Sequence, residues 1–146
     1  MNTPIRRLDG ITYWVIEDSS AIYDFINTNV RREWEGDSKS EDRDPSFYPF
    51  LRNLGEYRWS LQVVPTRLIT PDPDTMNYVN ERSGYVFSEA LSKRSDALET
   101  SIRKYDSVIS PVVVIKESYL LKDGFCRFTT LQRMKIPEVY AYVGER

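Results

Sequence analysis

The chain has 146 residues, 40% of them hydrophobic and 13% aromatic, which predicts about one domain with its own core and excludes a disordered chain. Its net charge of −2 provides no global field that would draw it onto nucleic acid or a membrane. The single cysteine excludes an internal disulfide framework and is typical of a reducing compartment, so we expect a cytoplasmic protein.

Other absences narrow the chemistry. Without histidine and with one cysteine, the chain is not expected to hold zinc, and histidine cannot act as a general base. A magnesium ion bound by carboxylates stays open. No apolar stretch approaches the ~20 residues that span a bilayer, and the N-terminus lacks the apolar segment of a secretory signal. No membrane partner is therefore expected.

The first third of the chain predicts a strand followed by a helix. Gly10–Asp18 is rich in β-branched and aromatic residues, which favours a strand. Apolar residues then recur at helical spacing from Ser19, with Ser19 or Ser20 as N-cap and Gly36 as the residue after the helix. The charged segment Asp37–Pro45 predicts an exposed loop. Phe47–Gly55 predicts one or two helical turns.

The remaining two thirds alternate between strands and helices. The pattern predicts a strand within 56–70, a turn-rich loop over 71–84 and helix from Ser88, which we expect to break near Ser95. The later segments are a buried strand Pro111–Ile115, a short strand Tyr119–Leu121, a helix Phe125–Lys135 and a closing strand Glu138–Val143. This order predicts an α+β fold with a small mixed sheet and packed helices, plus an N-terminal strand and helix.

The turn Asp123–Arg127 raises the main functional question. Arg127 falls in the first turn of a predicted helix, against the positive pole of the backbone dipoles. It could be solvated, at a cost of a few tenths of a kcal/mol, or it could bind an anion together with the free N–H groups of the helix start. Residues 91–146 carry a net +3, against −5 for residues 1–90, which mildly favours an anion here.

Each neighbouring residue has two interpretations. Gly124 would let phosphate oxygens approach the backbone, or is an ordinary turn glycine. Asp123 could bind Mg²⁺, orient an attacking hydroxyl as a catalytic residue, or cap the helix. Phe125 could stack on a base or close the core. Cys126 is a reactive thiol or a small buried hydrophobe. Thr129 could donate a hydroxyl to a phosphate or pack, and so could Thr130.

Two sequence motifs carry a resemblance to a known family. Leu98–Ile115 ("LETSIRKYDSVISPVVVI") resembles the signature L-x-x-S-I-[RK]-x-x-G-[VIL]-x-x-P-[IV]-x-V of the ParB N-terminal-like and sulfiredoxin family, although Asp106-Ser107 replaces the common glycine. Asp123–Arg127 is similar to its second signature, D-G-H-H-R, at the first, second and last positions. The closing segment Ile136–Glu145 is also similar. The resemblance implies a single domain with a ParB-like core over 56–146 and an N-terminal addition over 1–55.

The resemblance also implies a phosphate or nucleotide site at this turn. Its members include CTP-dependent DNA-partition proteins, sulfiredoxins, a free-serine kinase and reported nucleases, so the fold does not settle the chemistry. It implies binding through Gly124, Phe125, Cys126, Arg127 and Thr129, with Mg²⁺ and ATP, ADP or CTP as the expected ligands. If the chain is an enzyme, phosphoryl transfer or NTP hydrolysis is the expected class, with Asp123 as the catalytic residue.

The departures from each subtype leave alternatives open. Partition proteins have a helix-turn-helix domain after this module, whereas this chain ends at Arg146. Sulfiredoxin places its cysteine one residue further from the arginine, as F-G-G-C-H-R. The upstream glutamate of the kinase has three candidates here: Glu56, Glu81 and Glu89. The alternatives are a non-catalytic module for DNA or a protein partner, of phage or plasmid type, and a thiol enzyme that uses Cys126. The oligomeric state is not indicated.

Overall fold

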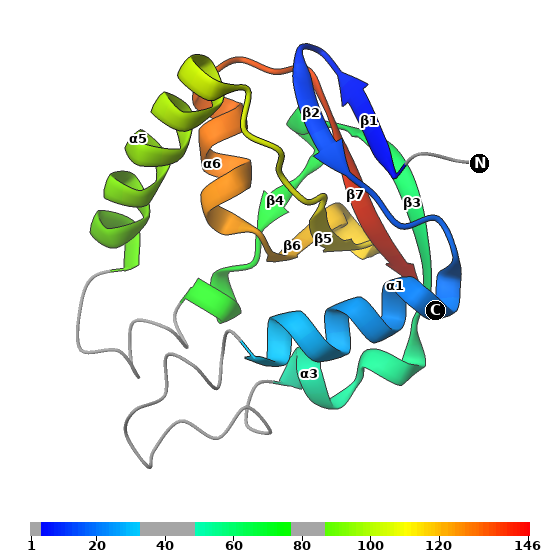
Figure 1. Cartoon of the computed structure of the whole chain (residues 1–146). Helices are drawn as coiled ribbons and strands as arrows, with labels where there is room; N and C mark the ends of the chain where they lie inside the picture. Colours follow the sequence, from blue (N-terminus) through cyan, green and yellow to red (C-terminus); the bar gives the residue numbers. More distant parts are fainter. Residues whose placement is uncertain (1–3, 33–48, 77–86) are drawn as a thin grey trace.

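The computed structural model describes residues 4–32, 49–76 and 87–146 (Figure 1). Its central element is a five-stranded mixed sheet in the order β3-β7-β5-β6-β4. The strands are β3 (Arg58–Pro65), β4 (Thr70–Pro71), β5 (Val112–Ile115), β6 (Leu120–Asp123) and β7 (Glu138–Glu145). β5 runs parallel to β7 and β4 parallel to β6, whereas the other two pairs are antiparallel. The α+β prediction with a small mixed sheet is confirmed.

An N-terminal β-hairpin was only half predicted. β1 (Ile5–Leu8) pairs with β2 (Ile11–Trp14), and the turn between them has positive φ at both Asp9 and Gly10. Such a two-residue Asp-Gly turn matches the twist of a hairpin. The predicted strand over Gly10–Asp18 therefore ends earlier, at Trp14. The strand before it was missed because two adjacent arginines, Arg6 and Arg7, interrupt its apolar residues.

The N-terminal helix differs in detail from the prediction. α1 (Ser19–Phe25) is capped by Asp18, whose side chain accepts a hydrogen bond from the Ala21 amide at 2.9 Å, so the predicted serine cap is wrong. The helix continues as a π-helical segment η1 (Ile26–Val30). Two short helices follow later in the chain, α3 (Pro49–Arg52) and the 3₁₀ turn η3 (Leu54–Glu56). Three predictions lie outside the described residues: the loop 37–45, Gly36 as the residue after the helix, and most of the loop 71–84.

The C-terminal helices were predicted more closely. α5 (Phe87–Tyr105) is one helix, so the expected break near Ser95 is wrong. Ser95 is fully buried within that helix, where burial in packing outweighs its weak helix propensity. α6 (Phe125–Arg133) begins where predicted and ends two residues early, and β7 runs two residues beyond the predicted strand. The 3₁₀ turns η4 (Thr66–Leu68) and η5 (Glu117–Tyr119) connect strands.

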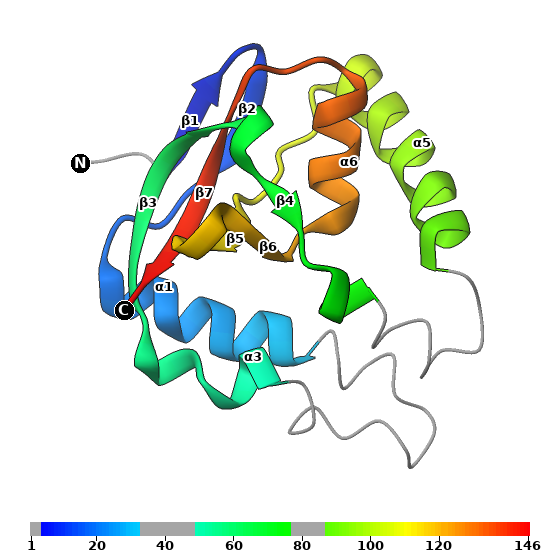
Figure 2. The ribbon, with the colours of Figure 1, turned by 180° about the vertical axis from the view of Figure 1, so that it is seen from behind.

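Each face of the sheet packs against its own set of buried residues (Figures 1 and 2). We call the set beneath α6, α5 and the hairpin the α6-side cluster: Ile11, Tyr13, Val15, Val64, Ile69, Ile102, Ile109, Val112, Val114, Leu121, Phe128, Leu131, Val139, Ala141 and Val143. We call the set beneath α1 and α3 the α1-side cluster: Ile22, Ile26, Val30, Phe50, Leu51, Leu54, Trp59, Val113, Ile115 and Tyr142.

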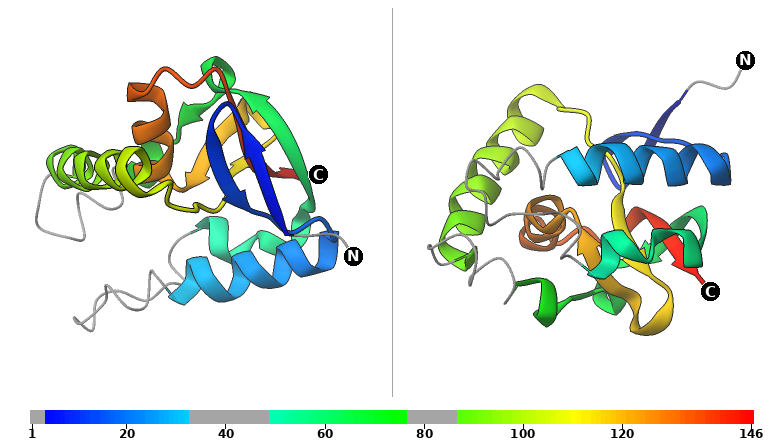
Figure 3. Two further views of the ribbon diagram at one scale, coloured as in Figure 1. Left: turned by 45° about the horizontal axis from the view of Figure 1, so that its top comes forward. Right: turned by 90° about the horizontal axis from the view of Figure 1, so that it is seen from below.

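The N-terminal segment thus contributes to both faces of the sheet. The hairpin supplies residues to the α6-side cluster and α1 supplies residues to the α1-side cluster, on opposite sides of the same strands (Figure 3). β2 is joined to the segment before β5 by hydrogen bonds between Thr12, Trp14 and Ile109 of 2.9–3.0 Å. The boundary at residue 55 between an addition and a core stays a prediction, because this packing joins the two parts.

Candidate functional site

The candidate site forms where β6 passes into α6. β6 ends at Asp123, and Gly124 follows in the left-handed conformation, with φ 88° and ψ 32°. A side chain at this position would be strained by that φ, and its Cβ would also lie 2.7 Å from Arg127 Nη2 and 3.0 Å from Val112 Cγ1. The backbone conformation and the close neighbours therefore both favour glycine at this position. The guanidinium of Arg127 lies directly against the glycine.

The guanidinium of Arg127 is mostly buried, not solvated. Its side chain is 23% exposed, and Nη2 lies 3.4 Å from Asp123 Oδ2 and 3.5 Å from the Pro111 carbonyl oxygen. Both contacts are long, since charge-assisted hydrogen bonds are about 2.7–2.9 Å. The Nε atom is buried and has no hydrogen-bond partner among the described residues. Much of the hydrogen-bonding capacity of this guanidinium is thus unused.

The side chain of Asp123 reaches the α1 side of the sheet because of a β-bulge. Val114 pairs with Leu121 and Val113 pairs with Asp123, so Lys122 is the extra residue in β6. Directly paired residues share a face of a sheet, and Val113 also pairs with Tyr142 of β7. Both partners belong to the α1-side cluster. The bulge therefore turns Asp123 toward the face that α1 covers.

Burial shifts the pKa of the Asp123 carboxyl. Desolvation raises the pKa of this carboxyl above its ordinary value, although the Arg127 charge and a hydrogen bond from the Gly124 backbone act in the opposite direction. On the same face of the sheet, burial also raises the pKa of Tyr142 in β7, whose hydroxyl oxygen accepts a hydrogen bond from the Ile16 amide at 3.1 Å. The carboxylate of Asp123 is thus less well stabilised than its arginine neighbour alone would suggest.

The start of α6 carries no side-chain cap. Gly124 has no side chain to accept a hydrogen bond from the first amides, and the first turn contains no acidic residue. The first helical hydrogen bond runs from the Phe128 amide to the Gly124 carbonyl oxygen, at 2.8 Å. The amides of Cys126 and Arg127 precede that bond, so neither has an acceptor within the helix.

The other predicted site residues differ in their surroundings. Phe125 packs against the α6-side cluster, as expected of a residue that closes the core. Cys126 is a half-buried free thiol, and its carbonyl oxygen accepts a hydrogen bond from the Thr130 hydroxyl at 2.8 Å. Thr130 is fully buried, whereas Thr129 is half-buried. Of the two threonines, Thr130 is therefore the one that packs.

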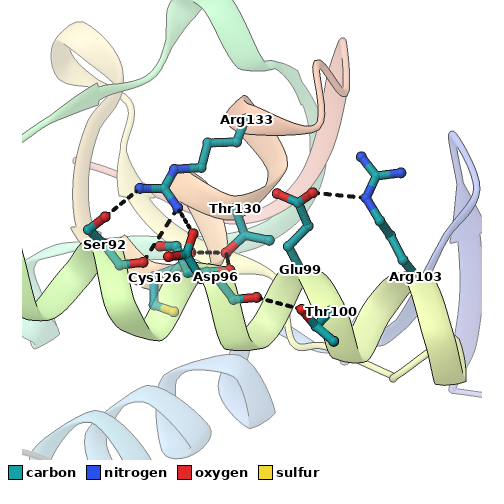
Figure 4. Close-up of polar contacts among 9 residues, drawn as sticks. Ser92, Asp96, Glu99, Thr100, Arg103, Cys126, Thr130 and Arg133 are labelled. Atoms are coloured by element: carbon teal, nitrogen blue, oxygen red, sulfur yellow. Dashed lines mark hydrogen bonds and ion pairs between the residues drawn. The ribbon is translucent and has the colours of Figure 1, made fainter.

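Hydrogen bonds to α5 hold α6 in position (Figure 4). The Arg133 guanidinium donates to Asp96 Oδ1 at 2.7 Å, to the Ser92 hydroxyl at 2.9 Å and to the Ser92 carbonyl oxygen at 3.4 Å. Nearer the start of α6, the Thr130 hydroxyl also lies 3.4 Å from the Ser95 carbonyl oxygen. These contacts link α6 to α5.

A buried ion pair next to the site was missed by the sequence analysis. Lys122 forms a close salt bridge with Asp72, and their side chains are 16% and 5% exposed. Asp72 also accepts hydrogen bonds from the Asp74 amide at 3.1 Å and the Thr75 hydroxyl at 3.0 Å. The two partners are 50 residues apart in sequence, so no local pattern could have revealed the pair. It ties the turn over 73–76 to the bulge of β6.

Within the described parts of the chain, no group of three or more Cys, Asp or Glu side chains could hold a metal ion. A magnesium ion held mainly by ligand phosphates needs only one or two carboxylates, and Asp123 is the carboxylate at the turn. In the same residues, no helix is both long and apolar enough to cross a lipid bilayer.

Comparison with known proteins gives structural likeness only. No family model matches the chain, and no curated protein matches it. Among solved structures it is similar to a Pnob8-like ParB-N domain (20% identity, TM-score 0.45, 63% of this chain and 31% of that chain). A second structure, of the pNOB8-like ParB N-domain, has 18% identity and a TM-score of 0.43, over 62% of this chain and 29% of that one.

The third similar structure is sulfiredoxin from Arabidopsis thaliana, with 19% identity and a TM-score of 0.40, over 59% of this chain and 85% of that chain. The two kinds of protein named by the sequence resemblance are thus also those that the chain resembles in structure. The chain spans about a third of the length of the two ParB chains. At these identities and TM-scores the likeness concerns the fold, and it carries no information about what the chain binds.

Proposed function

We propose that the chain binds a phosphate-bearing ligand, most specifically a nucleotide, at the turn Asp123–Arg127. The observation that carries the proposal is the placement of the Arg127 guanidinium against Gly124, at the uncapped start of α6, with Nε buried and unpartnered among the described residues. A buried guanidinium nitrogen without an acceptor is unfavourable unless a further group uses it. An anion would supply the missing acceptor.

The donors at this turn suit phosphate in particular. The first amides of a helix and the positive end of its dipole favour an anion. A guanidinium adds planar donors that match two phosphate oxygens at once. Gly124 leaves room for the Arg127 guanidinium to lie against the start of the helix. Gly124, Phe125, Cys126 and Arg127 would contribute through these groups, and the half-buried Thr129 could add its hydroxyl.

Catalysis is a further step of the proposal. If the ligand is a nucleoside triphosphate, Mg²⁺ would neutralise phosphate charge, and the reaction would be phosphoryl transfer or NTP hydrolysis. Asp123 is then the candidate general base or metal ligand. Its pKa is raised by burial, which makes its carboxylate a stronger base. Binding does not require this step, so the two are tested separately.

The test is ligand-dependent stability and direct binding. ATP, ADP and CTP, each with Mg²⁺, should raise the melting temperature of the wild-type chain, because a ligand that binds only the folded state stabilises it. Arg127→Ala should abolish the rise. Arg127→Lys should weaken it, since an ammonium group cannot make the two-pronged contact.

Arg133→Ala provides the matched control, because it removes an ion-paired arginine from the far end of the same helix. It should leave the ligand-induced shift unchanged. If no nucleotide shifts the melting temperature of the wild type but duplex DNA does, with strong salt dependence, the chain is a DNA-binding module and the nucleotide proposal is wrong. Rapid alkylation of Cys126 that inactivates the chain would instead favour a thiol enzyme.

A further inference from the structure

The carboxylate of Asp123 contacts the groups that the proposed ligand would use. Its Oδ2 atom lies 3.4 Å from Arg127 Nη2, one helical turn along the chain. It also takes a hydrogen bond from the Gly124 backbone, at the start of α6. The guanidinium is among the donors assigned above to phosphate, and this amide directly precedes the first amides of the helix. The protein's own carboxylate therefore lies where a negatively charged ligand would have to bind.

We propose that Asp123 is a built-in competitor for the anion, which must displace its carboxylate from the Arg127 guanidinium in order to bind. This inference rests on the proposed function. It applies to the site without bound metal, where the Asp123 carboxylate and the anionic ligand both face the Arg127 guanidinium. The contact is then autoinhibitory: it partly satisfies Arg127 while the site is empty and lowers the affinity for weakly charged ligands.

The geometry shows that this internal contact is one that a ligand could displace. On the same helix, the Arg133–Asp96 pair is closed at 2.7 Å, whereas the Arg127–Asp123 pair is 0.7 Å longer, at 3.4 Å. Oxygen at the longer distance gains only part of a charge-assisted hydrogen bond. The Nε atom of Arg127 gains nothing from Asp123 and stays unpartnered among the described residues. A ligand that approaches this atom makes a contact that Asp123 does not make.

The environment of Asp123 points the same way. The side chains of Asp123 and Arg127 are 16% and 23% exposed, so little water screens them from a third charge. Tyr142 is a further titratable group whose pKa the Arg127 charge influences, and burial raises that pKa and keeps the hydroxyl neutral. A dianionic or more highly charged ligand should therefore compete with the carboxylate better than a monoanion. Pyrophosphate and ATP are suitable probes, and inorganic phosphate is the weaker one.

The experiment is isothermal titration with inorganic pyrophosphate and with ATP, both in EDTA, on the full chain. Asp123→Asn keeps the side-chain shape and removes the charge, so both ligands should bind about tenfold tighter than they bind the wild type, equivalent to about 1.4 kcal/mol. Asp96→Asn is the matched control. It removes a carboxylate that pairs with the other arginine of α6, and it should leave both affinities unchanged.

The outcomes separate this inference from the function on which it rests. Tighter binding by Asp123→Asn, lost again in Asp123→Asn/Arg127→Ala, supports both. If the wild type binds and Arg127→Ala does not, but Asp123→Asn binds equally or more weakly, the competitor role is wrong while the phosphate site stands. If neither the wild type nor Asp123→Asn binds either probe, the proposed function itself fails. Melting curves of each variant show whether it is folded.

Discussion

Replacing Lys122 by methionine should destabilise the chain strongly, because it leaves Asp72 buried without its countercharge. The Asp72 side chain is 5% exposed, and it keeps only the hydrogen bonds from Thr75 and Asp74 after the substitution. Removing one partner of a buried ion pair typically costs about 3–5 kcal/mol. Since Lys122 retains some exposure, we expect the lower end, about 3 kcal/mol, which is about 6–12 °C in melting temperature for a chain of this size.

Urea unfolding at neutral pH measures this cost. Lys122→Met should lower the transition midpoint without changing the slope, whereas Asp72→Asn/Lys122→Met should lose less, because it leaves no unpaired charge. Arg133→Met serves as a control: its partner Asp96 is exposed, so breaking that pair should cost less than about 1 kcal/mol.

The dependence of stability on pH is a second measure of the Lys122–Asp72 pair. Burial raises the pKa of Asp72, but the hydrogen bond and charge of Lys122 outweigh it and bring the pKa below its ordinary value. The folded state therefore gains stability above the ordinary pKa, and loses it as the pH falls through the lowered one. Lys122→Met should weaken this acid dependence. A loss below about 1 kcal/mol at neutral pH, together with an unchanged acid dependence, would refute the reasoning.

Three further predictions follow from the site and its sheet. Gly124→Ala should lower stability by about 1–2 kcal/mol through its positive φ and abolish phosphate binding through contact with Arg127, which melting curves and titration would show. Gly144→Ala should cost about 1–3 kcal/mol in urea unfolding, since its Cβ would lie 2.8 Å from a tryptophan ring of β3; full stability would show that the ring can move. Because the pKa of Asp123 is raised, its contribution to stability is complete below its ordinary pKa and is lost as the pH rises through the folded one. Because Asp72 acts in the opposite direction, the wild type should gain less stability than Asp123→Asn as the pH rises from the acid range to neutrality, which unfolding of both chains would show.

The strands were predictable where burial imposes a simple pattern. β5 is buried on both faces and consists of an unbroken apolar run, so its sequence alone identifies it. The start of α6 was predictable from Asp-Gly followed by helical spacing. The continuity of α5 through Ser95 was not, because tertiary packing overrides local propensity there. The π-helical end of α1 was not predicted either, since its buried residues Ile26 and Val30 are four apart, as in an ordinary α-helix.

The candidate site was predictable only in its local part. Arg127 and Asp123 are four residues apart across a single turn, so their proximity is a local feature of the sequence. The bulge that directs Asp123 to the α1 side depends on how β6 pairs with β5, which a single sequence does not show. The salt bridge of Lys122 with Asp72 depends on the pairing of β6 with β4, and β4 is only two residues long. The pairing of strands distant in sequence therefore determines the parts of the site that local motifs do not predict.

The conformation of Asp106 is connected with the N-terminal hairpin. Asp106 follows α5 with a positive φ of 50°, at a position where glycine costs less. Its carboxylate accepts hydrogen bonds from Arg7 at 2.8 Å and from Thr12 at 3.2 Å, and both donors belong to the hairpin. Glycine would relieve the backbone strain, but it would remove this attachment between residues 99 positions apart. The strained Asp106 thus attaches the end of α5 to the N-terminal hairpin.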